Sequence, residues 1–172
     1  MEVRSVRTPT IYTNGENQMK APKIAIVLGS KSDLPYLADV EPLLERFGIS
    51  HRVVVASAHR QPAKVAAFAR GAEREGIEVI IACAGYAAHL PGVIASLTTL
   101  PIIGVPLDTS PLRGEDALLS IVQMPGGIPV AAVTIGKAGV KNAVVFAAEI
   151  LALKYPAIKS ALVAYRRELS RG

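Results

Sequence analysis

The fold class of this chain is decided by residues 24–33, which read IAIVLGSKSD. Five consecutive apolar residues ending at a glycine are typical of a parallel strand that is buried on both faces of a sheet. The Ser and Asp residues that follow are favoured helix N-caps, and Pro35 suits the first turn of a helix. The stretch therefore predicts a strand followed directly by a helix. That helix runs to about Phe47, and Pro42 should kink or split it.

The same alternation of strand and helix recurs along the rest of the chain. Further apolar strands are predicted at 52–56, 79–84, 102–107 and 130–135. Helices are predicted at 62–76, 91–98, 115–124 and 141–153, with a final amphipathic helix at 157–170. Strands that are apolar throughout and alternate with helices predict a parallel sheet covered on both faces. We therefore expect an α/β three-layer sandwich with a flavodoxin-like, doubly wound sheet of five parallel strands and a C-terminal helix.

The first 22 residues differ from the rest of the chain in composition. They are polar, show no periodicity and lack the apolar centre of a signal peptide. We interpret residues 1–22 as a disordered leader. The remaining residues, 23–172, suit a single catalytic α/β domain.

Composition excludes several classes of partner. The chain is 51% hydrophobic, yet no apolar stretch reaches the ~18 residues of a membrane span, so we expect no membrane. High apolarity without a span predicts surface that is buried between subunits of an oligomer. The net charge of +5 is modest and the basic residues are not interleaved with aromatics, which disfavours nucleic acid and suits a small anionic substrate. The single cysteine, Cys83, lies in an apolar strand, and nothing requires an oxidising compartment, so we expect a cytoplasmic protein.

The loops after the first strands are the candidate site, because ligands of such sheets bind beyond the carboxyl ends of the strands. The first loop offers Gly29, Ser30, Ser32 and Asp33. Gly29 allows close backbone approach, and the hydroxyls with the free N–H groups of a helix start form an anion site. Asp33 can accept hydrogen bonds from both ribose hydroxyls. The alternative is that the Ser and Asp residues only cap the helix.

The second loop, Ser57-Ala58-His59-Arg60, combines a proton carrier with a cation. His59 can give and take a proton near neutral pH, and the planar fork of Arg60 suits phosphate. The alternative is a capping Ser57 with a structural His59 and a solvated Arg60. A His–Arg pair at the carboxyl end of a parallel strand favours the functional interpretation.

The third loop, residues 85–92, reads GYAAHLPG. Its small residues leave room for a ligand, and His89 supplies a second polar group. The alternative is that His89 only caps the next helix. A fourth loop, residues 125–129, is either a plain connector or a contact with a neighbouring subunit. The sequence contains no Walker loop, no GxGxxG after the first strand and no metal-ligand spacing around its histidines, so no cofactor or metal is expected.

Four motifs together resemble one known family. GSKSD at 29–33, SAHRQP at 57–62, AAHLPG at 87–92 and SIVQMP at 120–125 closely resemble the N5-carboxyaminoimidazole ribonucleotide mutases of de novo purine synthesis, the class I PurE family. The resemblance runs from about Pro22 to the C-terminus. It implies a flavodoxin-like homo-octamer with sites near subunit interfaces. It also implies an isomerase that moves a carboxyl group from the exocyclic nitrogen of a ribonucleotide's aminoimidazole to a ring carbon, without ATP, metal or organic cofactor.

The resemblance also implies a role for each loop. Phosphate would be held by Ser30, Ser57 and Arg60, and ribose by Asp33. His59 would be the general acid/base, and the catalytic His89 would shape the pocket for base and carboxylate together with the third loop. The remaining predicted substrate-binding positions are Gly29, Ser32, Ala58, Gly85, Tyr86 and Leu90.

The third loop separates the two branches of this family. Residues 87–92 match the mutase branch, whereas the branch common in animals, which carboxylates aminoimidazole ribonucleotide directly, usually carries Ser-Asn there. Tyr86 stands where the family usually has Gly, and its bulk and hydroxyl are expected to narrow the site, alter binding or lower activity. The other hypotheses are direct carboxylation, a flavin- or nucleotide-binding module without catalysis, and a silent assembly protein whose pocket Tyr86 blocks.

Overall fold

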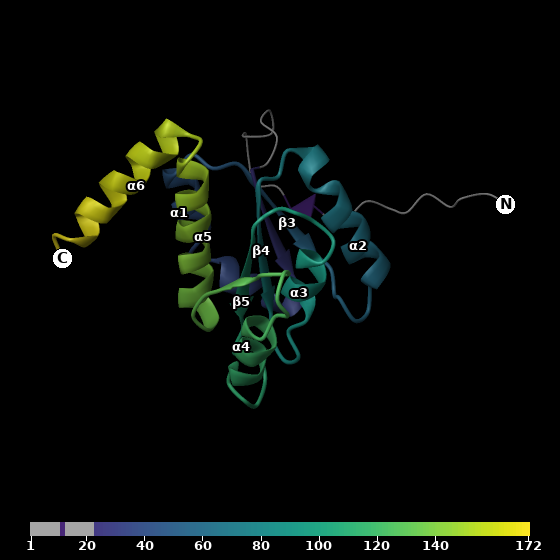
Figure 1. Cartoon of the computed structure of the whole chain (residues 1–172). Helices are drawn as coiled ribbons and strands as arrows, with labels where there is room; N and C mark the ends of the chain where they lie inside the picture. The colour runs from purple at the N-terminus through teal and green to yellow at the C-terminus, as the bar shows by residue number, and fades with distance from the viewer. Residues whose placement is uncertain (1–10, 13–22) are drawn as a thin grey trace.

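The computed structural model describes residues 11–12 and 23–172, and Figure 1 shows a sheet between two layers of helices. The strands are β1 (Ile11–Tyr12), β2 (Ile24–Leu28), β3 (His51–Val55), β4 (Val79–Ala84), β5 (Ile102–Pro106) and β6 (Ala131–Ala132). Their order is β1-β3-β2-β4-β5-β6, and every neighbouring pair is parallel except β1 with β3. The five parallel strands run in the doubly wound, flavodoxin-like order, which confirms the predicted fold class.

Helices connect the strands and cover both faces of the sheet. They are η1 (Lys31–Leu37), α1 (Glu41–Arg46), α2 (Pro62–Gly71), η2 (Glu73–Glu75), α3 (Leu90–Ala95), α4 (Glu115–Val122), α5 (Gly136–Ala152) and α6 (Pro156–Leu169). Helices α1 and α5 pack on one face, and α2, α3 and α4 pack on the other. This layering leaves the carboxyl ends of the strands free to carry loops.

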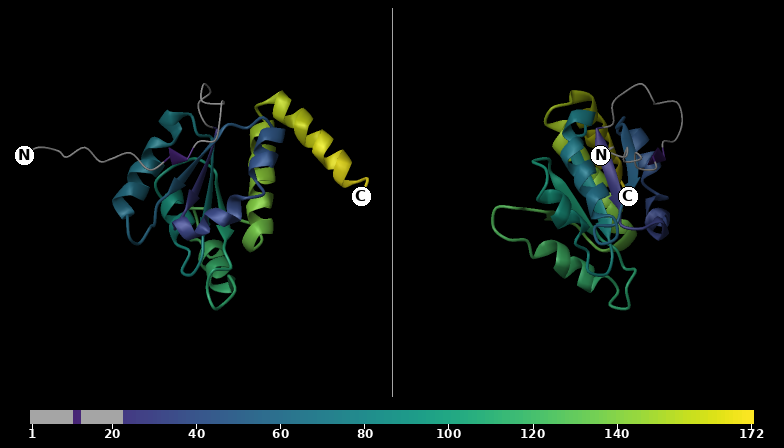
Figure 2. Two further views of the ribbon diagram at one scale, coloured as in Figure 1. Left: turned by 180° about the vertical axis from the view of Figure 1, so that it is seen from behind. Right: turned by 90° about the vertical axis from the view of Figure 1, so that its right-hand side faces the viewer.

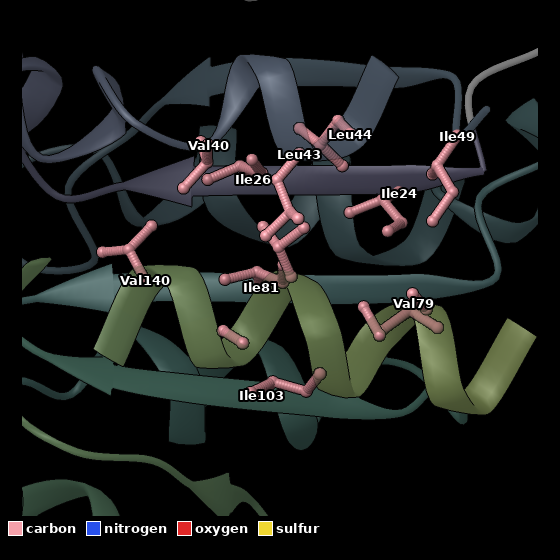
Figure 3. Close-up of a cluster of buried hydrophobic side chains, with 14 of the residues drawn as sticks. Ile24, Ile26, Val40, Leu43, Leu44, Ile49, Val79, Ile81, Ile103 and Val140 are labelled. Atoms are coloured by element: carbon pink, nitrogen blue, oxygen red, sulfur yellow. The ribbon is translucent and has the colours of Figure 1, made fainter. Parts of the chain in front are cut away.

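Strands β2 to β5 supply side chains to two separate cores, because successive residues of a strand point to opposite faces. Ile24 and Ile26 of β2 lie in the core beneath α1 and α5 (Figure 3), whereas Ala25 and Val27 face α2 and α3. All four side chains are fully buried. Burial of each isoleucine contributes about 1.5–3 kcal/mol. The double burial explains why the strand is apolar at every position.

The helix predicted after β2 is split, as the position of Pro42 suggested. The 3-10 helix η1 ends at Leu37, and α1 begins at Glu41 with Pro42 in its first turn. Proline lacks an N–H group and is tolerated only where that donor would be unpaired. Pro42 therefore begins a new helix instead of continuing the old one.

The predicted strand 130–135 is mostly absent from the sheet. Only β6 pairs, opposite Ile103 and Gly104 of β5, and α5 begins at Gly136 rather than at the predicted position 141. After β6 the chain passes close to the first turn of α5: a Cβ atom on Gly139 would lie 1.7 Å from the carbonyl oxygen of Thr134. Gly136 has a φ of +75°. These glycines favour no helix on their own, which is why the sequence pattern places the helix start too late.

Two other predicted helices differ in the structure. The helix predicted at 62–76 is α2 followed by η2, and it ends at Gly76, whose φ is +86°. The helix predicted at 91–98 is α3, which ends at Ala95. The first therefore ends at the predicted residue, whereas α3 ends three residues before the predicted position 98.

Strand β1 lies at one edge of the sheet, and the C-terminal helix lies beyond the sandwich. The leader predicted at 1–22 lies outside the described residues except for β1, which pairs with Val53 and Val54 of β3. The predicted C-terminal helix is α6, which contacts α5 and extends away from the sandwich (Figure 2). Within the described ranges, no helix is both long and apolar enough to cross a membrane.

Candidate functional site

A cavity of about 530 Å³ opens at the carboxyl ends of the parallel strands, between the loops after β2, β3 and β4. All the predicted site residues line it: Gly29, Ser30, Ser32, Asp33, Ser57, Ala58, His59, Arg60, Gly85, Tyr86, His89 and Leu90. Thr109 also lines the cavity and was missed by the sequence analysis. Thr109 follows β5. Because ligands of such sheets bind beyond the carboxyl ends of the strands, the same rule applied to the loop after β5 would have identified it.

The first loop is held by hydrogen bonds among its own side chains. Ser30 is the N-cap of η1: its Oγ accepts hydrogen bonds from the Ser32 amide at 3.3 Å and the Ser32 hydroxyl at 2.8 Å. The Ser30 amide in turn donates to Asp33 Oδ2 at 2.9 Å, completing a capping box. The capping interpretation is therefore correct, and the same side chains line the cavity as well.

Asp33 is a nearly buried carboxyl group at the floor of this loop. Its exposed fraction is 5%. Burial raises the pKa of Asp33, and the hydrogen bonds from Ser30 and Ser32 and the charge of Arg60 partly offset that effect. Ser32 Oγ donates to the other carboxylate oxygen, Oδ1, at 3.3 Å. Each oxygen keeps acceptor capacity, because a carboxylate oxygen has two lone pairs.

Arg60 joins the second loop to the first. Its Nη2 donates a hydrogen bond to the carbonyl oxygen of Gly29 at 3.2 Å, and its backbone amide donates to Ser57 Oγ at 3.3 Å. The guanidinium group is exposed and carries five N–H donors, of which one is used here. A positive group whose other donors have no partner among the described residues therefore lines the cavity, where it can bind an anion.

His59 and His89 meet across the cavity. His59 Nε2 lies 2.8 Å from His89 Nδ1, and the ring centroids are 4.9 Å apart with the rings inclined at 75°. Such a hydrogen bond needs one protonated and one unprotonated ring nitrogen, so the two imidazoles can pass a proton between them. His89 occupies the N-cap position of α3 but its side chain makes no capping bond, so the alternative that it merely caps this helix is wrong.

The third loop is shaped by close backbone contacts. A Cβ atom on Gly85 would lie 1.8 Å from Thr109 Oγ1, so only glycine fits there. Tyr86 follows with a φ of +54°. The amide of Ala88 donates to the carbonyl oxygen of Tyr86 at 2.8 Å, and that of His89 donates to Ala87 at 2.6 Å. These hydrogen bonds fix the backbone that places the His89 ring beside that of His59.

Cys83 lies behind this loop, on β4. It is fully buried, and burial raises the pKa of its thiol well above the usual value. The prediction that Cys83 is a packed small apolar residue is confirmed. Among residues 11–12 and 23–172, no three His, Cys, Asp or Glu side chains are grouped as metal ligands.

Comparison with known proteins agrees with this geometry. Residues 23–171 match the profile of the family described as AIR carboxylase. The N5-carboxyaminoimidazole ribonucleotide mutase of Pyrococcus abyssi is 54% identical over 150 residues, which cover 87% of this chain and 85% of that protein. The mutase of Thermotoga maritima is 52% identical over 150 residues, covering 87% and 86%.

A solved structure agrees as well. The crystal structure of Treponema denticola PurE superposes with a TM-score of 0.76 at 27% sequence identity, covering 87% of this chain and 92% of that chain. Both kinds of match confirm the resemblance carried by the loop motifs. The chain belongs to the AIR carboxylase family, together with relatives named N5-carboxyaminoimidazole ribonucleotide mutase.

Proposed function

We propose that the cavity is the active site of an isomerase that converts N5-carboxyaminoimidazole ribonucleotide to 4-carboxy-5-aminoimidazole ribonucleotide. The enzyme is an isomerase of purine biosynthesis, like its curated relatives. The observation that carries the assignment of the site is the 2.8 Å contact between His59 and His89, beside an anion-binding loop in one cavity. A proton carrier and a phosphate cradle are the two features that this reaction requires.

The first and second loops suit the phosphoribosyl end of the substrate. Arg60, most of whose donors have no partner within residues 11–12 and 23–172, pairs with the phosphate, and the hydroxyls of Ser30 and Ser57 donate to it. Asp33 accepts from the ribose hydroxyls through the lone pairs that its own loop leaves free. Holding the nucleotide at this end fixes the base near the two histidines.

The base end suits a decarboxylation followed by a recarboxylation. His59 donates its proton to the exocyclic nitrogen, the carbon–nitrogen bond breaks with its electron pair left on nitrogen, and carbon dioxide is released. The ring carbon then attacks carbon dioxide, and His59 takes the proton that this carbon loses. His59 ends in the protonation state in which it began, with His89 orienting the ring and sharing the proton. The small side chains of the third loop keep the gas close to the ring carbon.

The test is an assay without ATP on the N-carboxylated nucleotide. We expect turnover by the wild-type protein and a loss of about 10²–10⁴-fold in kcat for His59→Asn. Calorimetry with the product nucleotide should show that this variant still binds. His51→Asn is the matched control, because His51 lies at the opposite end of β3 and pairs with Glu41 at 3.1 Å. Near-normal turnover by His59→Asn would show that His59 is not the acid/base.

A second candidate is direct carboxylation of aminoimidazole ribonucleotide, which the family description favours. An initial rate that depends on bicarbonate, with aminoimidazole ribonucleotide as the starting substrate, would identify it. The match of residues 87–92 to the mutase branch supports the isomerase instead.

The same family membership supports a single catalytic domain over residues 23–172, a homo-octamer with sites near subunit interfaces, and a cytoplasmic location. The homo-octamer is also supported by apolar side chains exposed on the single chain, namely Leu112, Leu119, Val122, Leu153 and Leu169. Light scattering on the purified protein tests the assembly, and a monomeric mass would contradict it.

A further inference from the structure

Tyr86 is a large aromatic residue on the wall of the cavity, in a backbone conformation that disfavours it. Its φ is +54°, in the left-handed region where a bulky side chain is an outlier. Its side chain is 58% exposed even though it lines the cavity. Such strain persists only where the surrounding structure enforces it, and it is concentrated at functional sites.

The backbone conformation of Tyr86 is enforced by hydrogen bonds within its own loop and by the contact of Gly85 with Thr109. Gly85 is pressed against Thr109, and the backbone carbonyls of Tyr86 and Ala87 accept hydrogen bonds from Ala88 and His89. Ala88 is itself buried. The direction in which the Tyr86 side chain leaves the backbone is therefore set by the same contacts that place His89.

The folded chain makes little use of the Tyr86 ring. Among the described residues its hydroxyl has no hydrogen-bond partner and its ring has no aromatic or cationic neighbour, and more than half of its surface faces solvent. Among the described residues, Arg113 is the other non-glycine residue with a positive φ, at +52°, and it does not line the cavity. The Tyr86 ring lines the cavity and has no partner among the described residues. A ligand bound in the cavity can therefore make the contact that the folded chain does not supply.

We propose that Tyr86 controls how much released carbon dioxide is recaptured, because its ring lies against the bound nucleotide and covers the mouth of the cavity at its base end. This inference rests on the proposed isomerase. An aromatic face stacks on any heteroaromatic base, and a cover at this point slows the escape of released carbon dioxide. Without the cover, carbon dioxide leaves after the carbon–nitrogen bond breaks, and aminoimidazole ribonucleotide is released as a by-product. The aromatic ring of Tyr86, and not its hydroxyl, stacks on the base and covers the cavity.

The experiment compares Tyr86→Phe, Tyr86→Ala and Tyr86→Gly with the wild-type protein. Tyr86→Phe should match the wild type. The other two should bind the product nucleotide about tenfold more weakly by calorimetry, the loss expected for one base–aromatic contact. They should also release a several-fold larger fraction of aminoimidazole ribonucleotide per turnover.

The control variant is Arg113→Gly, which relieves the same backbone strain outside the cavity. Both glycine variants should raise Tm, because glycine adopts positive φ without cost, but only Tyr86→Gly should weaken nucleotide binding. Unchanged nucleotide binding in both Tyr86→Ala and Tyr86→Gly would overturn the inference. A wild-type protein that binds the nucleotide but does not isomerise it would overturn the proposed function instead, since the binding comparison does not depend on turnover.

Discussion

The hydroxyl of Tyr36 donates a 2.6 Å hydrogen bond to Asp108 Oδ1, which joins η1 to the loop after β5. Neither residue lines the cavity, but each belongs to a segment that does: η1 includes Ser32 and Asp33, and Asp108 precedes Thr109. Their bond ties together two loops that lie far apart in the sequence.

Removing the Tyr36 hydroxyl should destabilise the protein in a pH-dependent way. Tyr36→Phe should lower the free energy of unfolding by about 0.5–1.5 kcal/mol at neutral pH, the usual worth of one hydrogen bond. Burial and the bond to Asp108 raise the pKa of Tyr36 to about 12, from an ordinary value of 10.0. The stability contributed by this phenol is therefore complete below pH 10 and is lost as the pH rises towards 12. Urea unfolding across that range should show that the free energies of unfolding of the two proteins converge.

Tyr165→Phe is the control for the Tyr36 variant, since Tyr165 packs its ring on Phe47. A constant difference up to pH 12 would contradict the prediction.

Asp33 should make the free energy of unfolding depend on pH at the acidic end of the range, whereas Tyr36 does so at the alkaline end. Because burial raises the pKa of Asp33 above 3.8, the folded protein holds this proton more tightly than the unfolded chain. Its contribution to stability is therefore complete below pH 3.8 and is lost as the pH rises through the native pKa. Relative to Asp33→Asn, the wild-type protein should lose stability with rising pH in that window. Denaturant unfolding at several pH values measures the difference, with the exposed Asp39→Asn as control. A difference that grows with rising pH would show that the hydrogen bonds to Asp33 outweigh its burial.

The contact between Gly85 and Thr109 predicts a steric defect and a partial rescue. Gly85→Ala places a Cβ atom 1.8 Å from Thr109 Oγ1, which should lower the free energy of unfolding by about 1–3 kcal/mol. Adding Thr109→Ala removes that atom and should recover part of the loss. Gly126→Ala is the control, because no atom lies within 4 Å of its added Cβ. Equal stability of the Gly85 and Gly126 variants would mean that the loop adjusts without cost.

The two histidines should behave as one unit in kinetics. If His89 acts through the ring of His59, the double variant His59→Asn with His89→Asn should have a kcat close to that of His59→Asn alone. His89→Asn alone should lose less activity and should change the pH profile of kcat, because its partner ring has lost a hydrogen bond. Losses that multiply in the double variant would indicate separate roles on the substrate.

Patterns of local sequence predicted most of this fold. Four of the five predicted strands, at 24–28, 52–56, 79–84 and 102–107, are present over nearly their full length, and Pro42 divides the helix that was predicted to contain it. Strand β6 and the start of α5 were predicted less well, because Gly136 and Gly139 lower helix propensity. The close approach of Gly136 to Asp108 and of Gly139 to Val105 depends on residues that are far away in the sequence. A pattern read along the chain does not contain such contacts.

The sequence by itself determined the doubly wound fold and the loops that form the site, because apolar periodicity and the polar residues at strand ends are local properties. Only the tertiary structure decided how those loops meet. The hydrogen bond between His59 and His89 and the contact of Thr109 with Gly85 each join loops that follow different strands, and the positive φ of Tyr86 occurs beside that second contact. Their geometry depends on how the sheet stacks these loops at one edge, and side chains far apart in sequence become neighbours only when that packing is complete.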